Sequence, residues 1–151
     1  MLHRRILAAL IVAGAAPLAA QTAEKPALQA PLTLTAADSA RFLALGKSYT
    51  RWLLRGHADS LVAAMDPRAL EQLGGIERVQ QQTDMIAERR GTETRIVEEK
   101  LTRRMGRLQF WHSGEFSETP GDEFVIRWLL DEHGKITGAG LGPKANTPPV
   151  D

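Results

Sequence analysis

The sequence predicts an α+β fold, in which N-terminal helices pack on a curved four-stranded antiparallel sheet. Between residues 35 and 90 the apolar residues recur at helical spacing, whereas after Gly91 apolar and polar residues alternate with a period of two. The alternating segments are joined by short connections, which favours consecutive antiparallel hairpins. Helices that precede such a meander are expected to cover one face of the sheet.

The first helix is expected to begin at Thr35, because Thr35 followed by Asp38 three positions later resembles a capping box. Its apolar stripe is formed by five residues at helical spacing: Phe42, Leu45, Tyr49, Trp52 and Leu53. Gly46 lies on the same side and would allow close approach by another element. Gly56 is expected to end this helix.

Three further helices are predicted before the sheet. Asp59 is expected to cap the first of them, and Asp66 followed by Pro67 is a start signal for the second. The third follows two glycines, and its apolar face is formed by Ile76, Val79, Thr83 and Ile86. Gly91 comes after three charged residues and is expected to stop this last helix.

The predicted strands span residues 92–105, 107–116, 122–130 and 135–142. Alternation assigns the core-facing residues of the second and third strands: Leu108, Phe110, Gly114, Phe116, Phe124, Ile126, Trp128 and Leu130. The opposite face carries Trp111, Val125 and Leu129 and is too apolar for ordinary solvent-facing surface. We therefore expect these three residues to form an interface, in a homodimer or with a docked partner, unless a loop or the C-terminal tail covers them.

Residues 130–140, LDEHGKITGAG, gather several charged groups between the third and fourth strands. Glu132, His133 and Gly134 fit a hairpin loop in which Gly134 supplies the left-handed conformation. Asp131 can accept hydrogen bonds from the backbone amides of the turn. We therefore interpret these charges as turn chemistry and not as a metal or acid–base site.

The chain is predicted to consist of a signal peptide (1–20), a linker (21–34), one domain (35–143) and a disordered tail (144–151). Residues 1–20 combine a short positive region with an apolar run of eleven residues, from Ile6 to Ala16, which is too short to span a bilayer. This pattern predicts a periplasmic or secreted protein. The alternative is an uncleaved segment that anchors the protein to the membrane.

Composition excludes several classes of function. The chain has no cysteine, which excludes disulfides, a thiol nucleophile and cysteine metal ligands. Without the two arginines of residues 1–20, 17 of the 19 basic residues remain against 18 acidic ones, a net charge of −1 that provides no basic field for nucleic acid. The histidines lack the spacing of a metal site, and we predict neither a metal nor a cofactor.

Three segments carry a resemblance to a known superfamily: FLALGKSYTRWLLRGHADSLVAAMDPRAL, ERRGTETRI and DEHGKITGAGLGP. Across residues 36–143 the chain resembles small exported bacterial domains of unknown function in the cone-shaped, nuclear transport factor 2-like superfamily, which includes ketosteroid isomerase. The resemblance implies that ligands bind between the helices and the concave sheet, and that molecules pair through the outer sheet face. The superfamily hosts isomerases, dehydratases and pure binding modules, so the fold does not decide the function.

The candidate ligand-binding residues are His112, Tyr49, Phe110 and Trp128. His112 is two positions after Phe110 in the same strand, so its side chain should also face the helices. There it could be an acid, a base or a hydrogen-bond donor. The alternative is a core or rim histidine bonded to a backbone carbonyl. Tyr49 could act as a donor, as tyrosine does in ketosteroid isomerase, or be a core residue with a paired hydroxyl.

The predicted function is non-catalytic binding of a small apolar or amphipathic ligand in the cone, or of a protein partner on the outer sheet. The alternative is an enzyme with isomerase- or hydrolase-type acid–base chemistry that uses His112, Tyr49 and a nearby glutamate. Glu98 and Glu99 lie on a strand whose register the sequence does not settle, so that glutamate is not assigned. Convergent titratable groups in the cone would favour the enzyme, and an apolar cavity with a few polar anchors would favour the binding module.

Overall fold

The computed structural model describes residues 33–148, so the predicted signal peptide and nearly all of the predicted linker lie outside the described residues. Four helices come first: α1 (Ala36–Leu54), α2 (Ala58–Ala64), α3 (Pro67–Gln72) and α4 (Gly75–Arg90). Four strands and a 3-10 helix follow: β1 (Glu93–Arg104), β2 (Arg107–Phe116), β3 (Thr119–Leu130), β4 (Ile136–Pro143) and η1 (Lys144–Asn146). The strands pair antiparallel in the order β1-β2-β3-β4, which confirms the predicted α+β fold.

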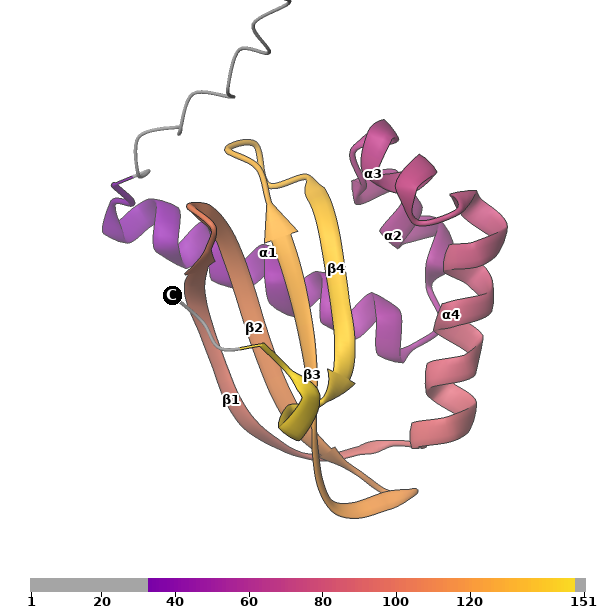
Figure 1. Ribbon diagram of the computed structural model, residues 1–151. Coiled ribbons are helices and arrows are strands. Elements are labelled where there is room, and N and C mark those ends of the chain that lie inside the picture. The colour runs from indigo at the N-terminus through magenta and orange to yellow at the C-terminus, as the bar shows by residue number, and fades with distance from the viewer. Residues whose placement is uncertain (1–32, 149–151) are drawn as a thin grey trace, which may run out of the picture.

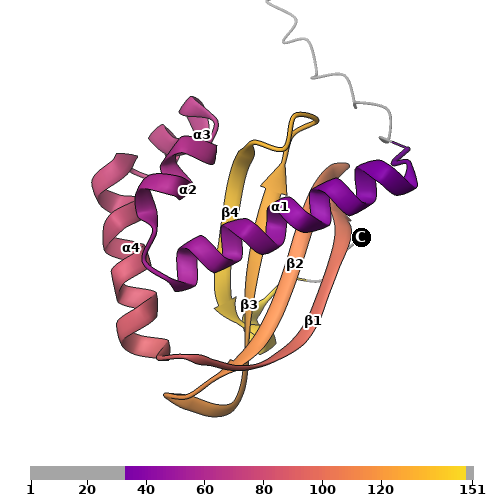
Figure 2. The same ribbon diagram turned by 180° about the vertical axis from the view of Figure 1, so that it is seen from behind.

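The helices cover one face of a curved sheet and extend past one of its edges. Helix α1 crosses the strands on one side, while α2, α3 and α4 lie beside β4 (Figure 1 and, from behind, Figure 2). Helix α4 packs mainly on the other three helices. We call the sheet face under α1 the inner face and the opposite one the outer face. Within residues 33–148 no helix is both long and apolar enough to cross a membrane.

Local sequence signals account for several helix ends. Thr35 and Asp38 form the predicted capping box, and the Asp66 side chain caps α3 ahead of Pro67. Helix α4 ends at Gly91, whose φ is +69°. Gly46 permits the close approach of α1 to β2, because a Cβ at this position would overlap the ring of Phe110.

Two predictions about the helices are wrong. Helix α2 begins at Ala58 with His57 as its N-cap residue and no side-chain cap, so Asp59 lies inside the first turn, where its charge still favours the helix. Ile76 does not join the apolar face of α4, since its side chain is 57% exposed, whereas Val79, Thr83 and Ile86 are buried. Ile76 is the second residue of α4 and lies in an exposed first turn, where Glu77 and Arg78 are exposed as well.

The hydrophobic core lies between the helices and the inner face. All the predicted core-facing residues of β2 and β3 are buried. The β3–β4 connection is the predicted turn, in which Oδ1 of Asp131 accepts from the backbone amides of His133 at 2.9 Å and Lys135 at 2.7 Å. Gly134 has a φ of +88° and lies against Leu45 of α1, so the turn also fixes the sheet relative to the helices.

The outer face is less open than its apolar sequence suggests. Trp111 is 7% exposed and Val125 is fully buried, while Leu129 is half-buried. The ammonium of Lys100 lies 5.5 Å from the centre of the Trp111 ring. Long cationic side chains can cover an apolar face with their methylene groups, which reduces the surface left for a partner.

Residues Lys144–Asn146 form η1 instead of belonging to the disordered tail that the sequence predicts from residue 144. This short helix packs on β3, on the side of the sheet opposite α1 (Figure 1). Nζ of Lys144 binds both carboxylate oxygens of Glu123, at 2.8 and 2.7 Å, which holds the segment on the outer face.

Candidate functional site

His112 is the centre of a charged cluster on the inner face of β2. The residue is 1% exposed, with Nε2 2.6 Å from Oε1 of Glu93 and Nδ1 3.2 Å from Oε1 of Glu99. Oε2 of Glu99 in turn lies 2.7 Å from Nζ of Lys47 in α1. Three elements thus bring together four titratable groups, which we call the His112 cluster: Lys47, Glu93, Glu99 and His112.

The register of β1 explains how both glutamates reach His112. Glu99 pairs directly with His112 across the β1–β2 ladder, so the two side chains lie on the same face. The position of Glu93, opposite Phe116, depends on two bulges in β1. One lies between Glu93 and Arg95 and the other between Ile96 and Glu98. Each bulge places an extra residue opposite β2 and bends the strand. As a result Ile96, which simple alternation would put on the outer face, lies on the same side as Glu99.

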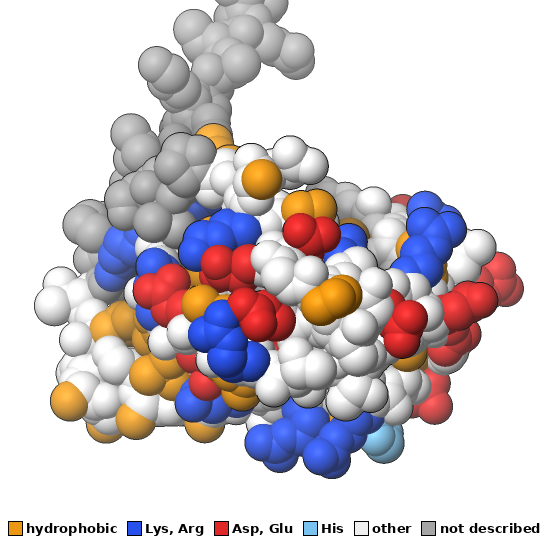
Figure 3. Space-filling model, turned by 90° about the horizontal axis from the view of Figure 1, so that it is seen from below, with side chains coloured by type: hydrophobic (Ala, Val, Ile, Leu, Met, Phe, Trp, Pro, Cys, Tyr) orange, Lys and Arg blue, Asp and Glu red, His pale blue; other side chains and the backbone are white. Residues whose placement is uncertain are grey.

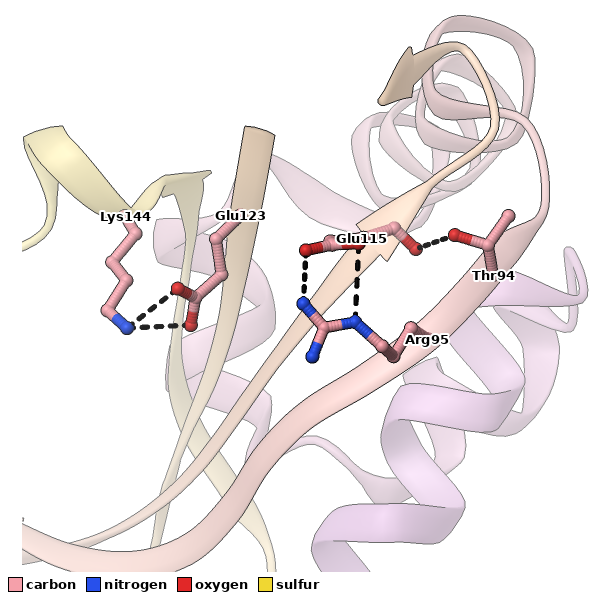
Figure 4. A network of polar contacts seen from close by, with 5 residues as sticks. All are labelled: Thr94, Arg95, Glu115, Glu123 and Lys144. Carbon is pink, nitrogen blue, oxygen red and sulfur yellow. Dashed lines mark hydrogen bonds and ion pairs between the residues drawn. The ribbon is translucent and has the colours of Figure 1, made fainter. Parts of the chain in front are cut away.

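The first bulge is fixed to β2 by side chains. Oγ1 of Thr94 donates to the backbone carbonyl of Glu115 at 3.1 Å, and the guanidinium of Arg95 forms an ion pair with the Glu115 carboxylate (Figure 4). On the inner side, Gly114 leaves room for Glu93, because a Cβ at this position would overlap Oε1 of that glutamate. The bulge therefore directs Glu93 toward His112 and away from solvent.

A cavity of about 690 Å³ opens beside the His112 cluster. This volume lies within the range of small-molecule sites, about 300–1,000 Å³. Its charged lining residues are Lys47, Arg51, Arg55, Glu93, Glu99 and His112. Leu54, Ala87 and Ile96 supply apolar surface to the same wall. The lining is thus both charged and apolar. Its lysine and arginines come from the C-terminal half of α1 and from its C-cap residue, Arg55.

The two carboxylates govern the protonation of His112. Burial acts to lower the pKa of this imidazole, but the hydrogen bonds and charges of Glu93 and Glu99 outweigh burial and raise the pKa above its ordinary value. Burial likewise acts to raise the pKa of Glu99, but the hydrogen bonds from Lys47 and His112 outweigh it and lower the pKa. The cluster therefore favours an imidazolium between two carboxylates, which donates from both ring nitrogens.

This arrangement determines which groups can meet a ligand. Both nitrogens of His112 are occupied, so the imidazole acts on a ligand only through the glutamates that it orients. The side chains of Glu93 and Glu99 are 19% and 17% exposed, and that of Lys47 is 49% exposed. A molecule in the cavity would therefore meet two oriented carboxylates and a lysine, with the histidine behind them.

The four predicted ligand-binding residues do not lie together at this cavity. His112 lines it, whereas Tyr49, Phe110 and Trp128 are not among its lining residues and are at most 4% exposed. The Tyr49 hydroxyl donates to the carbonyl of Gly134 at 2.7 Å, and Nε1 of Trp128 donates to Oγ1 of Thr50 at 2.9 Å. Their polar atoms are thus satisfied inside the core, which is the structural role that the sequence left open for Tyr49.

Sequence reasoning missed Glu93, Lys47, Arg51 and Arg55. The three basic residues occur at intervals of four along α1, a spacing that places them on one helix face and that could have been noticed. Glu93 lies six positions before Glu99, so alternation puts the two on one face, but the sequence did not settle which face that is and could not show that two bulges bring Glu93 opposite Phe116. Glu99 was one of two adjacent candidates, and the register now assigns it to the inner face.

Charges of both signs lie side by side near this region. Seen from the end where α4 connects to β1 and β2 turns into β3, acidic and basic side chains alternate on the surface, with apolar groups between them (Figure 3). This face therefore carries no continuous basic field of the kind that nucleic-acid binding uses. Within residues 33–148 no group of three or more histidine, aspartate or glutamate side chains is arranged to hold a metal ion.

The fold is compatible with a nuclear transport factor 2-like cone, since helices precede and cover a four-stranded antiparallel sheet. The comparisons with known proteins found no matching family model, no matching curated protein and no matching solved structure.

Proposed function

We propose that this chain is an exported nuclear transport factor 2-like domain that binds a small amphipathic anion in the cavity beside the His112 cluster. The observation that carries the proposal is a histidine only 1% exposed, held by two carboxylates at the wall of a cavity of about 690 Å³. Burying such a charged cluster costs desolvation free energy that a well-packed apolar substitute would avoid. Its position on a cavity wall therefore supports a role in recognition.

The lining indicates the chemistry of the ligand. Arg51 and Arg55 are exposed, and neither forms an ion pair within the described part of the chain. They are suited to a carboxylate or another anionic group. Ile96 is 53% exposed beside them and could be covered by an apolar ligand body. Glu93 could accept a hydrogen bond from a hydroxyl or amino group of the same molecule.

Defined carboxylates can test this proposal by NMR on the full chain. The probes are benzoate, phenylacetate, indole-3-acetate and octanoate, each compared with its uncharged primary amide. We expect at least one carboxylate to shift the His112 ring and Ile96 methyl resonances and to bind at least fivefold more tightly than its amide. The double variant Arg51→Gln, Arg55→Gln should remove this preference, whereas Arg68→Gln and Arg107→Gln, at two exposed arginines that do not line the cavity, should retain it. No response to any probe at millimolar concentration would overturn the proposal.

A second candidate is acid–base catalysis in the same cavity. The observation in its favour is the convergence of four titratable groups, two of them with shifted pKa values. Glu93 is the group placed to accept a proton, because Oε1 is oriented by His112 and Oε2 has no hydrogen bond within the described residues. His112 would then be a positioning residue.

Exchange of α-hydrogens tests this second candidate without a known substrate. In D₂O an acid–base site should deuterate a ketone probe such as 4-phenyl-2-butanone faster than buffer does. Glu93→Gln should reduce that rate to the buffer level while leaving probe binding within about twofold. A rate that is unaffected by Glu93→Gln would rule out this role.

The predicted homodimer through Trp111, Val125 and Leu129 also stays a proposal. Its support is the apolar character of the outer face, and its weakness is the burial of Trp111 and Val125 within a single chain. Light scattering of the mature protein at tens of micromolar should give twice the monomer mass, and Leu129→Glu should reduce that mass to the monomer value. A monomer mass for the wild type would contradict the dimer.

A further inference from the structure

β4 is an edge strand, and its free side is open along most of its length. The sheet order leaves β4 with a strand neighbour on one side only. At its start this side is covered, because Ile136 bridges Met65 and its carbonyl accepts from the backbone amide of Asp66 at 2.9 Å. From Thr137 to Leu141 no further backbone hydrogen bond reaches this side within the described residues. Backbone donors and acceptors are therefore exposed along the edge.

Most of this edge lacks the protection that natural sheets usually give their outermost strands. Such strands commonly carry a charged residue or a proline that prevents pairing with another chain. β4 has no charged residue, and its one proline, Pro143, is its last residue, so residues 136–142, ITGAGLG, contain neither. The lysines on either side of this segment bind other groups and do not protect the edge. Lys135 donates to the carbonyl of Ala63, and Lys144 binds Glu123. Residues 136–142 therefore carry neither a charge nor a proline ring that would keep a second strand away from this edge.

An apolar groove runs beside the open edge. A cavity of about 400 Å³ lies between α4 and the last two strands. Its apolar lining consists of Leu73, Met85, Ile86, Phe124, Ala139 and Leu141. Figures 1 and 2 show α4 standing alongside β4, in agreement with its packing mainly on the other helices. The groove is therefore bounded by a helix on one side and a strand with unpaired backbone on the other.

The charged lining residues of this groove are both basic. Arg90 places its guanidinium 4.2 Å from the centre of the Phe124 ring and donates to Oγ1 of Thr119. Arg89 is exposed and forms no ion pair in the part of the chain that the structure describes. No acidic residue lines the groove. An occupant would therefore gain from carrying a negative charge at this position.

We propose that this groove binds an extended peptide segment of a partner protein, which adds as a strand to β4. The peptide backbone would pair with residues Thr137–Leu141, alternate apolar side chains would enter the groove, and an acidic side chain would meet Arg89. An amphipathic acid would satisfy the apolar lining and Arg89 but would leave the open backbone groups of β4 unused. The edge strand therefore favours a peptide over a lipid-like ligand.

Selection from a library of phage-displayed random octapeptides tests this site on the immobilised full chain. We expect enriched peptides to alternate apolar and polar residues and to contain aspartate or glutamate. Chemically synthesised copies should shift the amide resonances of Thr137–Leu141 and slow their hydrogen exchange, without shifting the His112 ring. This readout separates the groove from the cavity proposed above, so that either site can fail without the other.

Matched variants separate strand addition from nonspecific attraction. Methylating alternate peptide nitrogens should reduce affinity at least tenfold, because it removes donors to β4 and changes no side chain. Arg89→Glu should reduce affinity for the acidic peptides at least tenfold, whereas Arg107→Glu, at an exposed arginine of β2 that does not line the groove, should change it less than twofold. Circular dichroism establishes that both variants fold.

Three results would overturn the proposal. The first is a selection that enriches no peptide. The second is a set of peptides that keep their affinity in both methylated forms, the one with the odd-numbered nitrogens methylated and the one with the even-numbered nitrogens methylated. The third is dodecanoate binding that shifts Met85 and Leu141 while no peptide is enriched, which would identify the groove as a site for amphipathic acids.

Discussion

Glu93 and His112 are 19 positions apart in the sequence, and Oε1 of the glutamate lies 2.6 Å from Nε2 of the histidine. The contact depends on the two bulges in β1, which bring Glu93 opposite Phe116, and on Gly114 of β2, which leaves space for the Glu93 carboxylate. Together with Glu99 on the other ring nitrogen, this contact gives the buried His112 a carboxylate partner on each ring nitrogen. Its protonation therefore reports on the whole cluster.

Gly114→Ala should separate Glu93 from His112. The added Cβ would overlap Oε1 of Glu93 and lie 3.1 Å from the carbonyl oxygen of Arg95, so the glutamate must move away. We expect the pKa of His112 to fall relative to the wild-type value, because one of the two carboxylates that raise it is displaced. Overpacking should also reduce the free energy of unfolding by about 1–3 kcal/mol. An NMR titration of the imidazole and urea unfolding measure the two effects.

Gly142→Ala is the matched control for this substitution. Gly142 lies in β4, and a Cβ added there would meet no atom within 4 Å. The same glycine-to-alanine change should therefore leave the pKa of His112 unaltered and change stability by less than about 1 kcal/mol. An equal fall in the His112 pKa in both variants would contradict the role assigned to Gly114.

The stability of the protein should depend on pH in a way that this cluster determines. The pKa of His112 is raised in the folded state, so its contribution is complete below the unfolded value of 6.5 and is lost as the pH rises through the folded pKa. The pKa of Glu99 is lowered, so its contribution is complete above the unfolded value of 4.5 and is lost as the pH falls through the folded pKa. These two groups therefore favour maximal stability between about pH 4.5 and 6.5.

Urea unfolding at a series of pH values checks this prediction. For each unit by which the His112 pKa is raised, about 1.4 kcal/mol of stability should disappear between pH 6.5 and the folded pKa. His112→Gln should abolish that loss, although it should also reduce stability at every pH because Glu93 and Glu99 lose the cation between them. A variant that keeps the wild-type slope above pH 6.5 would show that another group is responsible.

The sequence predicted the fold more completely than the site, and β1 shows why. Alternation of period two held along β2 and β3, where the core faces were assigned correctly from residues such as Phe110 and Trp128. In β1 two bulges interrupt that alternation, and a bulge leaves no sequence signature of its own in a polar strand. Alternation still puts Glu93 on the face of Glu99, because the two bulges cancel, but the place of Glu93 along β2, opposite Phe116, depends on strand pairing that a single-strand pattern does not contain.

The outer face illustrates a second limit. The alternation of residues along each strand placed Trp111 and Val125 on this face correctly. It contained no information about the residues that would cover them. The ammonium of Lys100 lies over the Trp111 ring, and η1 packs on β3. Both are tertiary contacts, so an apolar strand face did not by itself establish an exposed interface.

Tyr49→Phe should weaken the fold and leave the His112 cluster intact. The hydroxyl of this residue donates to the buried carbonyl of Gly134 at 2.7 Å, and its removal leaves that acceptor without a partner. We expect a loss of about 1–3 kcal/mol in the free energy of unfolding. The NMR titration of His112 and the affinity for carboxylate probes should not change. A change in either of them would return Tyr49 to the ligand-binding site.

Gly46→Ala provides a test in which two physical effects have opposite signs. Helix propensity alone predicts that alanine within α1 stabilises the protein by about 1 kcal/mol. The added Cβ would, however, overlap the Phe110 ring, which is fully buried in β2 and cannot move into open space. We expect the steric effect to dominate, with a net loss of about 1–3 kcal/mol in the free energy of unfolding. A second substitution, Phe110→Leu, should recover part of that loss because it withdraws the ring from the contact. A stabilised Gly46→Ala variant would show that α1 does not approach β2 as closely as the structure places it.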